Sequence, residues 1–380
     1  MKKTFLSLMF LIIGNLYVFG YNDASTFFTA LYYPQAAYFM TDRIGVLVGT
    51  NGFRFMGTIL STYPFLKTYN TPSEEEAKTY GKFKFTSVIP SAFIGFAYTN
   101  SDKWFGVGGG YELDHYENGK AYGYMVHTPV ITLSFLENHA LKFNIPVSIG
   151  HGYGALTNVK VYSTLVHARY NVPHDIVQQL RFYVFYGHLN INANEKVDAD
   201  SFGINFGIYF HAFGNDKFSF DPYLRVGYYT SIKDAKASYY TEYGNFSPYD
   251  ISAQIENPSK FDGSDFMSSM PTGFYAEKMY MISLSPRLGL TAQSDFITLY
   301  GEPIFSYNIY GGKNMQFNGE KFTVPLMQFS YGLYIELYIT PTKELELYLE
   351  ADMRGNSQSV LGFNRNGFSF DSCTGLKWYF

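Results

Sequence analysis

SFGINFGIYFHAF at residues 201–213, a turn at Gly214-Asn215-Asp216, and FSFDPYLRVGYY at residues 218–229 form the clearest pattern in the chain. In both stretches the even-numbered residues are mostly apolar, and the odd-numbered ones are mostly polar or glycine. Because side chains along a strand point alternately to opposite faces, each stretch predicts a strand with one apolar face. The short turn between them predicts a hairpin.

Similar segments cover most of the chain beyond residue 42. Their arms are about 10 to 15 residues long, which is close to the length of a membrane-spanning strand and longer than a typical strand of a soluble sandwich. About fourteen strands are predicted, an even number, as bacterial barrels have. We expect an all-β, transmembrane antiparallel β-barrel over residues 43–380. The predicted strands are 43–68, 82–98, 103–116, 121–136, 140–151, 155–170, 178–192, 200–213, 217–232, 274–291, 295–310, 321–340, 344–356 and 366–380.

The connections between these strands alternate in length. Those at 99–102, 136–140, 171–177, 213–216, 292–295 and 340–343 are short, and the opposite set includes the long connections 69–81, 233–273 and 311–320. Short turns on the periplasmic side and long loops outside are typical of outer-membrane barrels. The pattern therefore predicts that residues 233–273 form a long extracellular loop.

Composition agrees with a membrane barrel. Aromatic residues make up 20% of the 380 residues and charged residues 16%, against about 25% charged in soluble domains. The net charge of −4 offers no basic footprint for nucleic acid, so we expect no nucleic-acid partner. The single cysteine, Cys373, excludes an intramolecular disulfide framework.

Both termini indicate export. Residues 1–20 carry Lys2-Lys3, an apolar run and small residues up to Gly20, which predicts a signal peptide; an uncleaved anchor is the alternative. At the other end, Gly375, Trp378 and Phe380 resemble the assembly signal of bacterial outer-membrane barrels, although an ordinary last strand would also alternate. We expect a bacterial outer-membrane protein, with membrane lipids and the barrel-assembly machinery as partners.

Two regions lack sustained alternation. Residues 21–42 are predicted to form a short lumen or plug segment, a lead-in, or part of the first strand. The loop 233–273 is rich in apolar residues, which indicates packing over the barrel mouth or onto a ligand. Its candidate entry surface for a small hydrophobic ligand consists of Phe246, Phe261, Phe266 and Met267.

A family resemblance follows from three stretches. YPQAAY at residues 33–38 with DRIGV at 42–46, IPSAF at 89–93 through TNSDKWFGVG at 99–108, and the hairpin 203–231 resemble FadL-like outer-membrane transporters. Tyr33 stands where that family has Asn, and Gln35 interrupts its Pro-Ala pair. The resemblance implies a barrel of about fourteen strands that carries long-chain fatty acids or other hydrophobic compounds.

Catalytic and metal-binding patterns are missing from the sequence. The eight histidines are scattered without metal-ligand spacing, and no Gly-x-Ser-x-Gly motif occurs, so we expect neither an enzyme, nor a cofactor, nor a metal site. Glu346, Glu350 and Asp352 share one strand face, which is typical of a polar lumen wall. The candidate lumen residues are Tyr223, Arg225, Arg287, Tyr348 and Arg354.

Three functions remain open at this point: passive uptake of hydrophobic compounds such as fatty acids, a general diffusion porin for small polar solutes, and a barrel that displays loop 233–273 as a surface protein or adhesin. The first is our principal expectation. The porin is favoured if residues 21–42 stay outside the lumen.

Overall fold

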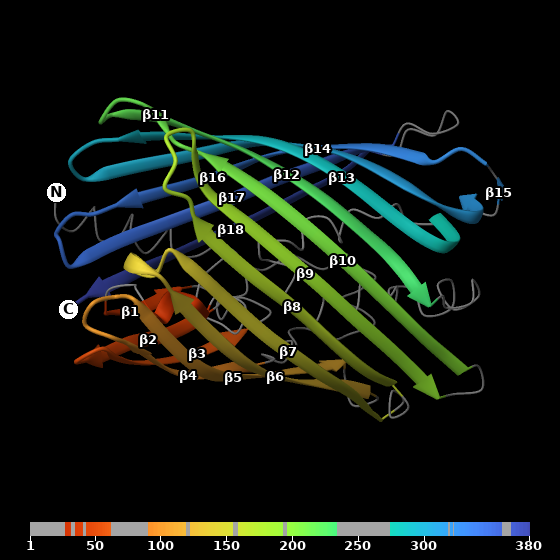
Figure 1. Ribbon diagram of the computed structural model, residues 1–380, viewed down its shortest axis with the longest axis horizontal. Coiled ribbons are helices and arrows are strands. Elements are labelled where there is room, and N and C mark those ends of the chain that lie inside the picture. The colour runs from red at the N-terminus through yellow and green to blue at the C-terminus, as the bar shows by residue number, and fades with distance from the viewer. Residues whose placement is uncertain are drawn as a thin grey trace, which may run out of the picture.

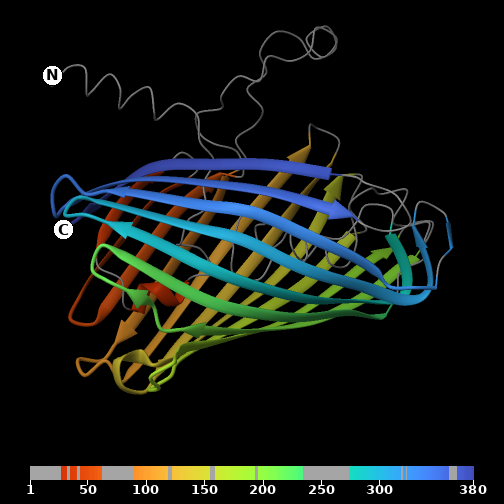
Figure 2. The ribbon, with the colours of Figure 1, turned by 90° about the horizontal axis from the view of Figure 1, so that it is seen from above.

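The computed structural model is a closed antiparallel β-barrel (Figure 1). It describes residues 27–31, 35–40, 43–61, 90–118, 122–154, 159–192, 196–233, 274–317, 320–321, 323–358 and 366–380. The described strands form one sheet, which closes because β1 (Ala36–Met40) pairs with β18 (Asn366–Tyr379) on one side and with β2 (Arg43–Thr50) on the other. Figure 2 shows the opposite walls crossing one another, because strands tilt in a closed barrel.

Sixteen strands make up the wall among the described residues. Two further strands of two residues each, β11 (Phe213–Gly214) and β15 (Glu320–Lys321), extend neighbouring hairpins. The remaining strands are β3 (Phe53–Ser61), β4 (Pro90–Thr99), β5 (Phe105–Asn118), β6 (Tyr122–Phe135), β7 (Leu141–Gly154), β8 (Val159–Asn171), β9 (Val177–Asn192), β10 (Lys196–Phe210), β12 (Phe218–Lys233), β13 (Phe274–Gln293), β14 (Ile297–Phe317), β16 (Leu326–Ile339) and β17 (Leu345–Gln358).

The predicted barrel is confirmed, but the predicted number of about fourteen strands is too low by two. The predicted strand 43–68 is the hairpin β2–β3, which turns at Asn51-Gly52, where both residues have positive φ (49° and 82°). The short strand β1 lies within residues 21–42, where no strand was separately predicted, because its five residues are too few to show sustained alternation. Both errors lie at the seam where the barrel closes.

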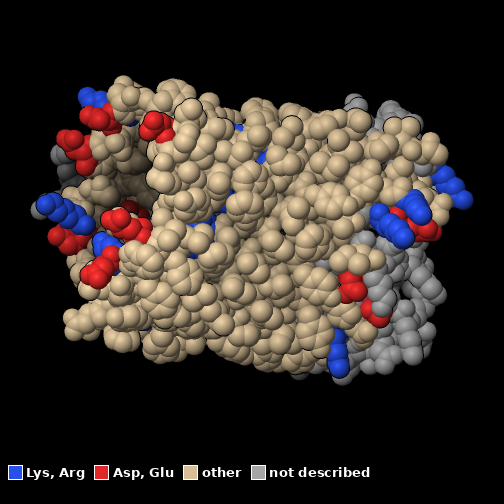
Figure 3. Space-filling view, viewed as in Figure 1, with Lys and Arg blue, Asp and Glu red and all other residues tan. Residues whose placement is uncertain are grey.

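The two faces of the wall differ in polarity. Exposed apolar side chains such as Phe96, Ile131, Phe182 and Ile204 point outward, whereas Thr132, Asn144, Asn205 and Ser283 are buried on the inner face. On the side seen in Figure 3, charged side chains gather at the two ends of the barrel, and the band between them is nearly free of charge. An apolar outer band and a polar interior are the arrangement that spans a membrane.

Short turns join the strands at the end of the barrel that carries Phe380 (Figure 1). This end includes the 3-10 helix η2 (Glu137–His139), between β6 and β7. The connections 62–89 and 234–273 belong to the opposite end, as the predicted grouping requires. The predicted connection 311–320 is wrong over most of its length, because β14 continues to Phe317 and pairs there with β15. Among the described residues, no helix is long and apolar enough to cross a membrane.

The 3-10 helix η1 (Phe27–Leu31) precedes the first strand and lies inside the ring of strands. Phe27, Ala30 and Leu31 are buried against inner-face residues Leu47, Met56, Phe93, Ala97 and Val130. The hydroxyl of Thr99 donates a hydrogen bond to the carbonyl oxygen of Leu31 (3.0 Å). Residues 27–31 of the predicted segment 21–42 therefore contact the inner wall, while residues 21–26, 32–34 and 41–42 lie outside the described part.

Candidate functional site

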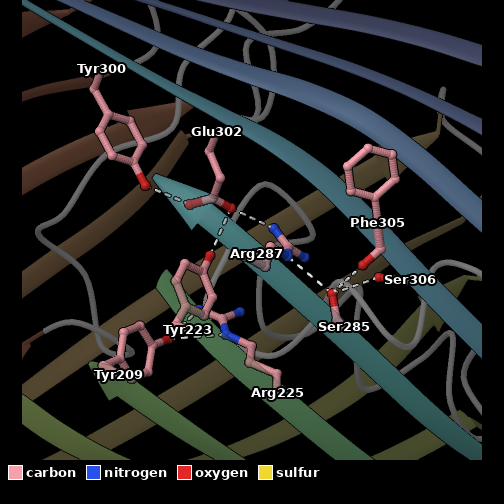
Figure 4. Close-up of polar contacts among 9 residues, drawn as sticks. All are labelled: Tyr209, Tyr223, Arg225, Ser285, Arg287, Tyr300, Glu302, Phe305 and Ser306. Carbon is pink, nitrogen blue, oxygen red and sulfur yellow. Dashed lines mark hydrogen bonds and ion pairs between the residues drawn. The ribbon is translucent and has the colours of Figure 1, made fainter. Parts of the chain in front are cut away.

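The inner wall of β12, β13 and β14 carries a buried polar network (Figure 4). Tyr223 on β12 lies directly opposite Arg287 on β13, and Glu302 follows on β14. The Arg287 guanidinium donates to Glu302 Oε1 at 2.8 Å, and the hydroxyl of Tyr223 donates to the same oxygen at 2.7 Å. The hydroxyl of Tyr300 donates to the other carboxylate oxygen at 2.6 Å. One carboxylate thus joins three strands.

A second group of contacts continues the network toward β10. Arg225 donates through Nε and Nη2 to the hydroxyl of Tyr209, at 3.0 and 2.8 Å. The ring of Tyr209 stacks on that of Tyr223, with centroids 4.6 Å apart. The sequence places these side chains together because residues 209, 223, 225 and 287 occupy the inner-facing positions of adjacent strands.

Carboxylates gather on the neighbouring wall formed by β16 and β17. Glu336 and Glu350 occupy directly opposed positions, and Asp352 lies next along the same face of β17. Tyrosine hydroxyls hold these groups: Tyr338 donates to Glu336 at 2.7 Å, and Tyr348 donates to Glu350. Glu346 forms an ion pair with Lys377 at 2.9 Å. Hydroxyl donors of this kind stabilise a buried carboxylate.

Among the described residues from β7 to β17, cations predominate on the inner face of β7 to β13 and carboxylates predominate on that of β14 to β17. The inner-face cations of β7 to β13 are Lys142, Arg169, Arg181, Arg225 and Arg287, and the inner-face carboxylates of β14 to β17 are Glu302, Glu336, Glu346, Glu350 and Asp352. The two groups meet at the Arg287–Glu302 ion pair, whose side chains are 2% and 7% exposed. In a ring of sixteen strands, β17 stands eight strands from β7 and so lies across the lumen from it. The separation is incomplete, because β12 also carries the inner-face carboxylate Asp221, and β5 carries Glu112 and Asp114.

The predicted lumen residues are placed as follows. Tyr223, Arg225 and Arg287 come together in the first network, whereas Tyr348 lies on β17, beside Met40 and Tyr338. The backbone of Arg354 belongs to β17, but its side chain lies outside the described part of the structure. The predicted entry residues Phe246, Phe261, Phe266 and Met267, and the predicted signal peptide ending near Gly20, also lie outside it.

Sequence reasoning missed Glu302, Tyr300, Tyr209 and Arg181. A signal for Glu302 was present, because residues 300, 302 and 304 alternate on one face of the predicted strand 295–310. What the sequence could not give is the register that places Glu302 within reach of both Arg287 and Tyr223.

One group of potential metal ligands lies on the outer face. Ligand atoms of His188, Asp198 and Asp200 are within 4.8 Å of one another, and His188 Nδ1 is 2.7 Å from a carboxylate oxygen of Asp200. Asp200 also accepts a hydrogen bond from the hydroxyl of Tyr186 at 2.9 Å.

Three solved structures resemble the chain at low identity. OmpT, an outer membrane protein of Vibrio cholerae, is 10% identical, with 77% of this chain and 89% of that chain covered and a TM-score of 0.32. OccK10 (OpdN) of Pseudomonas aeruginosa is 10% identical, with 92% and 98% covered and a TM-score of 0.33. The beta domain of the Bordetella autotransporter BrkA is 10% identical, with 91% and 98% covered and a TM-score of 0.27.

No curated protein matches the chain. A family model does: the one described as Serpulina hyodysenteriae variable surface protein matches residues 2–379. This is a different family from the FadL-like transporters that the three sequence stretches resemble, so the finer resemblance has no support from the comparisons. Because the match covers nearly the whole sequence, the chain belongs to the Serpulina hyodysenteriae variable surface protein family.

Proposed function

We propose that this protein is a passive channel for small polar solutes in a bacterial outer membrane. The observation that carries the proposal is the charged and polar inner wall, in which cations of β7 to β13 and carboxylates of β14 to β17 meet at Arg287 and Glu302. A wall of charged and hydroxyl groups is stable facing water and polar solutes, but it disfavours an apolar cargo. Residues 27–31 lie inside the barrel, which does not meet the condition that favoured a porin from the sequence, so the proposal rests on the chemistry of the wall. The proposal requires no catalytic step and no cofactor.

Uptake of hydrophobic compounds such as fatty acids, our principal expectation from the sequence, is the less favoured form of transport. The largest apolar cluster described on the inner face is already covered by Phe27, Ala30 and Leu31 of η1. The remaining support for a hydrophobic cargo comes from the loop predicted at 233–273, of which residues 234–273 lie outside the described part of the structure. Fatty-acid uptake therefore stays a prediction from the sequence.

The test is single-channel conductance of the refolded protein, without residues 1–20, in a planar bilayer. We expect steady current steps that grow in proportion to salt concentration. A barrel shown to be folded and inserted, yet silent over repeated trials, would contradict the channel. A parallel assay for movement of a fluorescent fatty acid into liposomes distinguishes the hydrophobic-cargo alternative.

Surface display is a second candidate, favoured by the name of the family and by the position of the longest connections. Residues 62–89 and 234–273 belong to the end of the barrel opposite Phe380. If they face the outside of the cell, protease added to intact cells will cut there and leave the short turns intact. Cleavage only after cell lysis would argue against this orientation.

We also propose that Gly375, Trp378 and Phe380 act in assembly of the barrel. Trp378 and Phe380 are exposed, and Trp378 lies on the outward face of β18. They are available to the assembly machinery and, afterwards, to membrane lipids at the interface, where aromatic residues gather. Phe380→Ala is expected to reduce the folded fraction in cells while leaving the refolded protein unchanged in thermal stability.

A further inference from the structure

The outer face of the β9–β10 hairpin carries one histidine and two aspartates close together. His188 on β9 lies directly opposite Asp200 on β10, and Asp198 follows two residues away on the same face of β10. This face points away from the lumen, because Ile204, which has the same orientation on β10, is exposed, whereas Asn205 beside it is buried. The group lies near the end of the hairpin at which the two strands are joined.

The ligand atoms of the three side chains converge. His188 Nδ1 is 2.7 Å from Asp200 Oδ1 and 3.9 Å from Asp198 Oδ1, and all three ligand atoms lie within 4.8 Å of one another. In a tetrahedral zinc site, where each ligand atom is about 2.0–2.2 Å from the ion, the ligand atoms are about 3.3 Å apart. The two distances from Nδ1 lie on either side of this value. Small side-chain rotations therefore bring the three atoms to one ion.

Two tyrosines outside the group help to orient its side chains. The hydroxyl of Tyr186 donates to Asp200 at 2.9 Å. The ring of Tyr162 on β8 packs beside the ring of His188, with centroids 5.8 Å apart. Metal-binding imidazoles and carboxylates are held in place by outer-shell contacts of this kind.

Charge and access also suit a cation. When His188 is neutral, as an imidazole ligand must be, the two carboxylates give the group two negative charges, which a divalent cation balances. The side chains of His188, Asp198 and Asp200 are 25%, 45% and 21% exposed. An ion can therefore reach them from outside the barrel.

The set of donor atoms selects the class of ion. Calcium takes six to eight oxygen ligands, whereas an imidazole nitrogen suits zinc and other transition metals. Three protein ligands, with water in the fourth position, form a common zinc site. We propose that His188, Asp198 and Asp200 bind a divalent transition-metal ion, with zinc as the ion that fits this set, and that the ion joins β9 to β10 on the outer surface.

Strand pairing creates this site, which explains why the spacing of histidines in the sequence predicted no metal. His188 and Asp200 are twelve residues apart in the chain and become neighbours only in the hairpin. The inference is independent of the proposed channel function, because the three side chains lie outside the lumen.

The test is a calorimetric titration of Zn²⁺ into the refolded, detergent-solubilised protein, without residues 1–20 and without a histidine tag. We expect saturable binding of Zn²⁺ and no saturable binding of Ca²⁺ at the same concentrations. His188→Gln and Asp200→Asn are each expected to raise Kd at least about tenfold, because even changes to outer-shell partners cost about 10–100-fold in metal affinity. Tyr186→Phe keeps all three ligands and is expected to raise Kd less.

His151→Gln is the matched control. His151 lies on the outer face of β7, two residues from the exposed Ile149, and its ring stacks on that of His127 with centroids 5.5 Å apart. Because it lies outside the proposed group, this substitution is expected to leave Kd for Zn²⁺ within about twofold. If a variant that lacks a ligand fails to fold, Asp198→His tests the same site by gain, since a second imidazole is expected to lower Kd.

Several outcomes would overturn the site: equal Zn²⁺ affinity in the parent protein and His188→Gln, equal binding of Ca²⁺, or no saturable binding of Zn²⁺. Loss of binding in His151→Gln but not in His188→Gln would also overturn it, by placing the ion at the His127–His151 pair. A barrel that binds Zn²⁺ but does not conduct would contradict the channel alone, and a barrel that conducts without binding Zn²⁺ would contradict this site alone.

Discussion

Glu302 is the residue on which the charge balance of the β12–β14 network depends. It accepts hydrogen bonds from Tyr223, Tyr300 and Arg287, and the ion pair with Arg287 is almost fully buried. Glu302→Gln leaves the Arg287 guanidinium without this carboxylate in a buried position. Breaking a buried pair by removing one partner costs about 3–5 kcal/mol. We expect a loss of this order in the free energy of unfolding, measured by urea titration in micelles.

Glu346 provides the matched control for Glu302. Its ion pair with Lys377 has the same type of geometry, at 2.9 Å, but the side chains are 14% and 25% exposed. Glu346→Gln is therefore expected to cost much less than Glu302→Gln, about 1 kcal/mol, because water screens the remaining charge. Equal losses for the two variants would contradict the importance of burial at Glu302.

His139 is expected to make the stability of the β6–β7 turn depend on pH. The residue is buried in η2, outside the spanning strands, and Ser134 Oγ lies 2.7 Å from its Nδ1. Burial lowers the pKa of His139 below its ordinary value of 6.5, and the positive charges of Lys142 and Lys103 lower it further. Because the unfolded chain binds the proton more readily than the folded chain, protonation of His139 favours unfolding. The stability that neutral His139 contributes is therefore fully present above about pH 6.5, and it is lost as pH falls toward the lowered pKa.

His139→Gln is expected to reduce the pH dependence of stability below about pH 6.5, because glutamine does not titrate there. The measurement compares thermal unfolding of the variant and the parent protein from pH 7.5 down to pH 5. An unchanged slope in His139→Gln would refute the role of this imidazole.

At the level of elements, η1 depends on glycines of β4 and β5. A Cβ atom at Gly95 would lie 2.4 Å from a ring carbon of Phe27, and one at Gly108 would lie 2.9 Å from another. The Gly-rich run at 106–110 therefore provides room on the inner face for Phe27.

Gly95→Val is expected to displace η1 from the inner wall, because the added side chain occupies the position of the Phe27 ring. If η1 narrows the lumen, single-channel conductance should rise in this variant. Gly109→Val is the matched control, since a Cβ there meets nothing within 4 Å. Unchanged conductance in a folded Gly95→Val barrel would show that η1 does not limit the pore.

The whole barrel was predictable from the sequence to the extent that alternation reports strands. The hairpin quoted first is β10 and β12, where the predicted inner residues Tyr223 and Arg225 are buried. The way in which the barrel closes was not predictable from alternation, because β1 has only five residues. Its position in the sheet is determined by its pairing with both β18 and β2. Asn51-Gly52, a typical hairpin turn, was the available signal for the extra strand.

The concentration of carboxylates on β14 to β17 leads to a prediction for the molecule as a whole. Glu350→Gln combined with Asp352→Asn removes two buried carboxylates from β17 and leaves the cations of β7 to β13 in place. If the barrel conducts, the reversal potential in a potassium chloride gradient should shift toward chloride, by roughly two- to fivefold in the permeability ratio, as expected for loss of nearby charges in a wet pore. Glu344→Gln, in the exposed β16–β17 turn, changes the net charge without changing the wall and should shift it little. Equal shifts for both proteins would mean that net charge, and not the position of the carboxylates on the wall, determines selectivity.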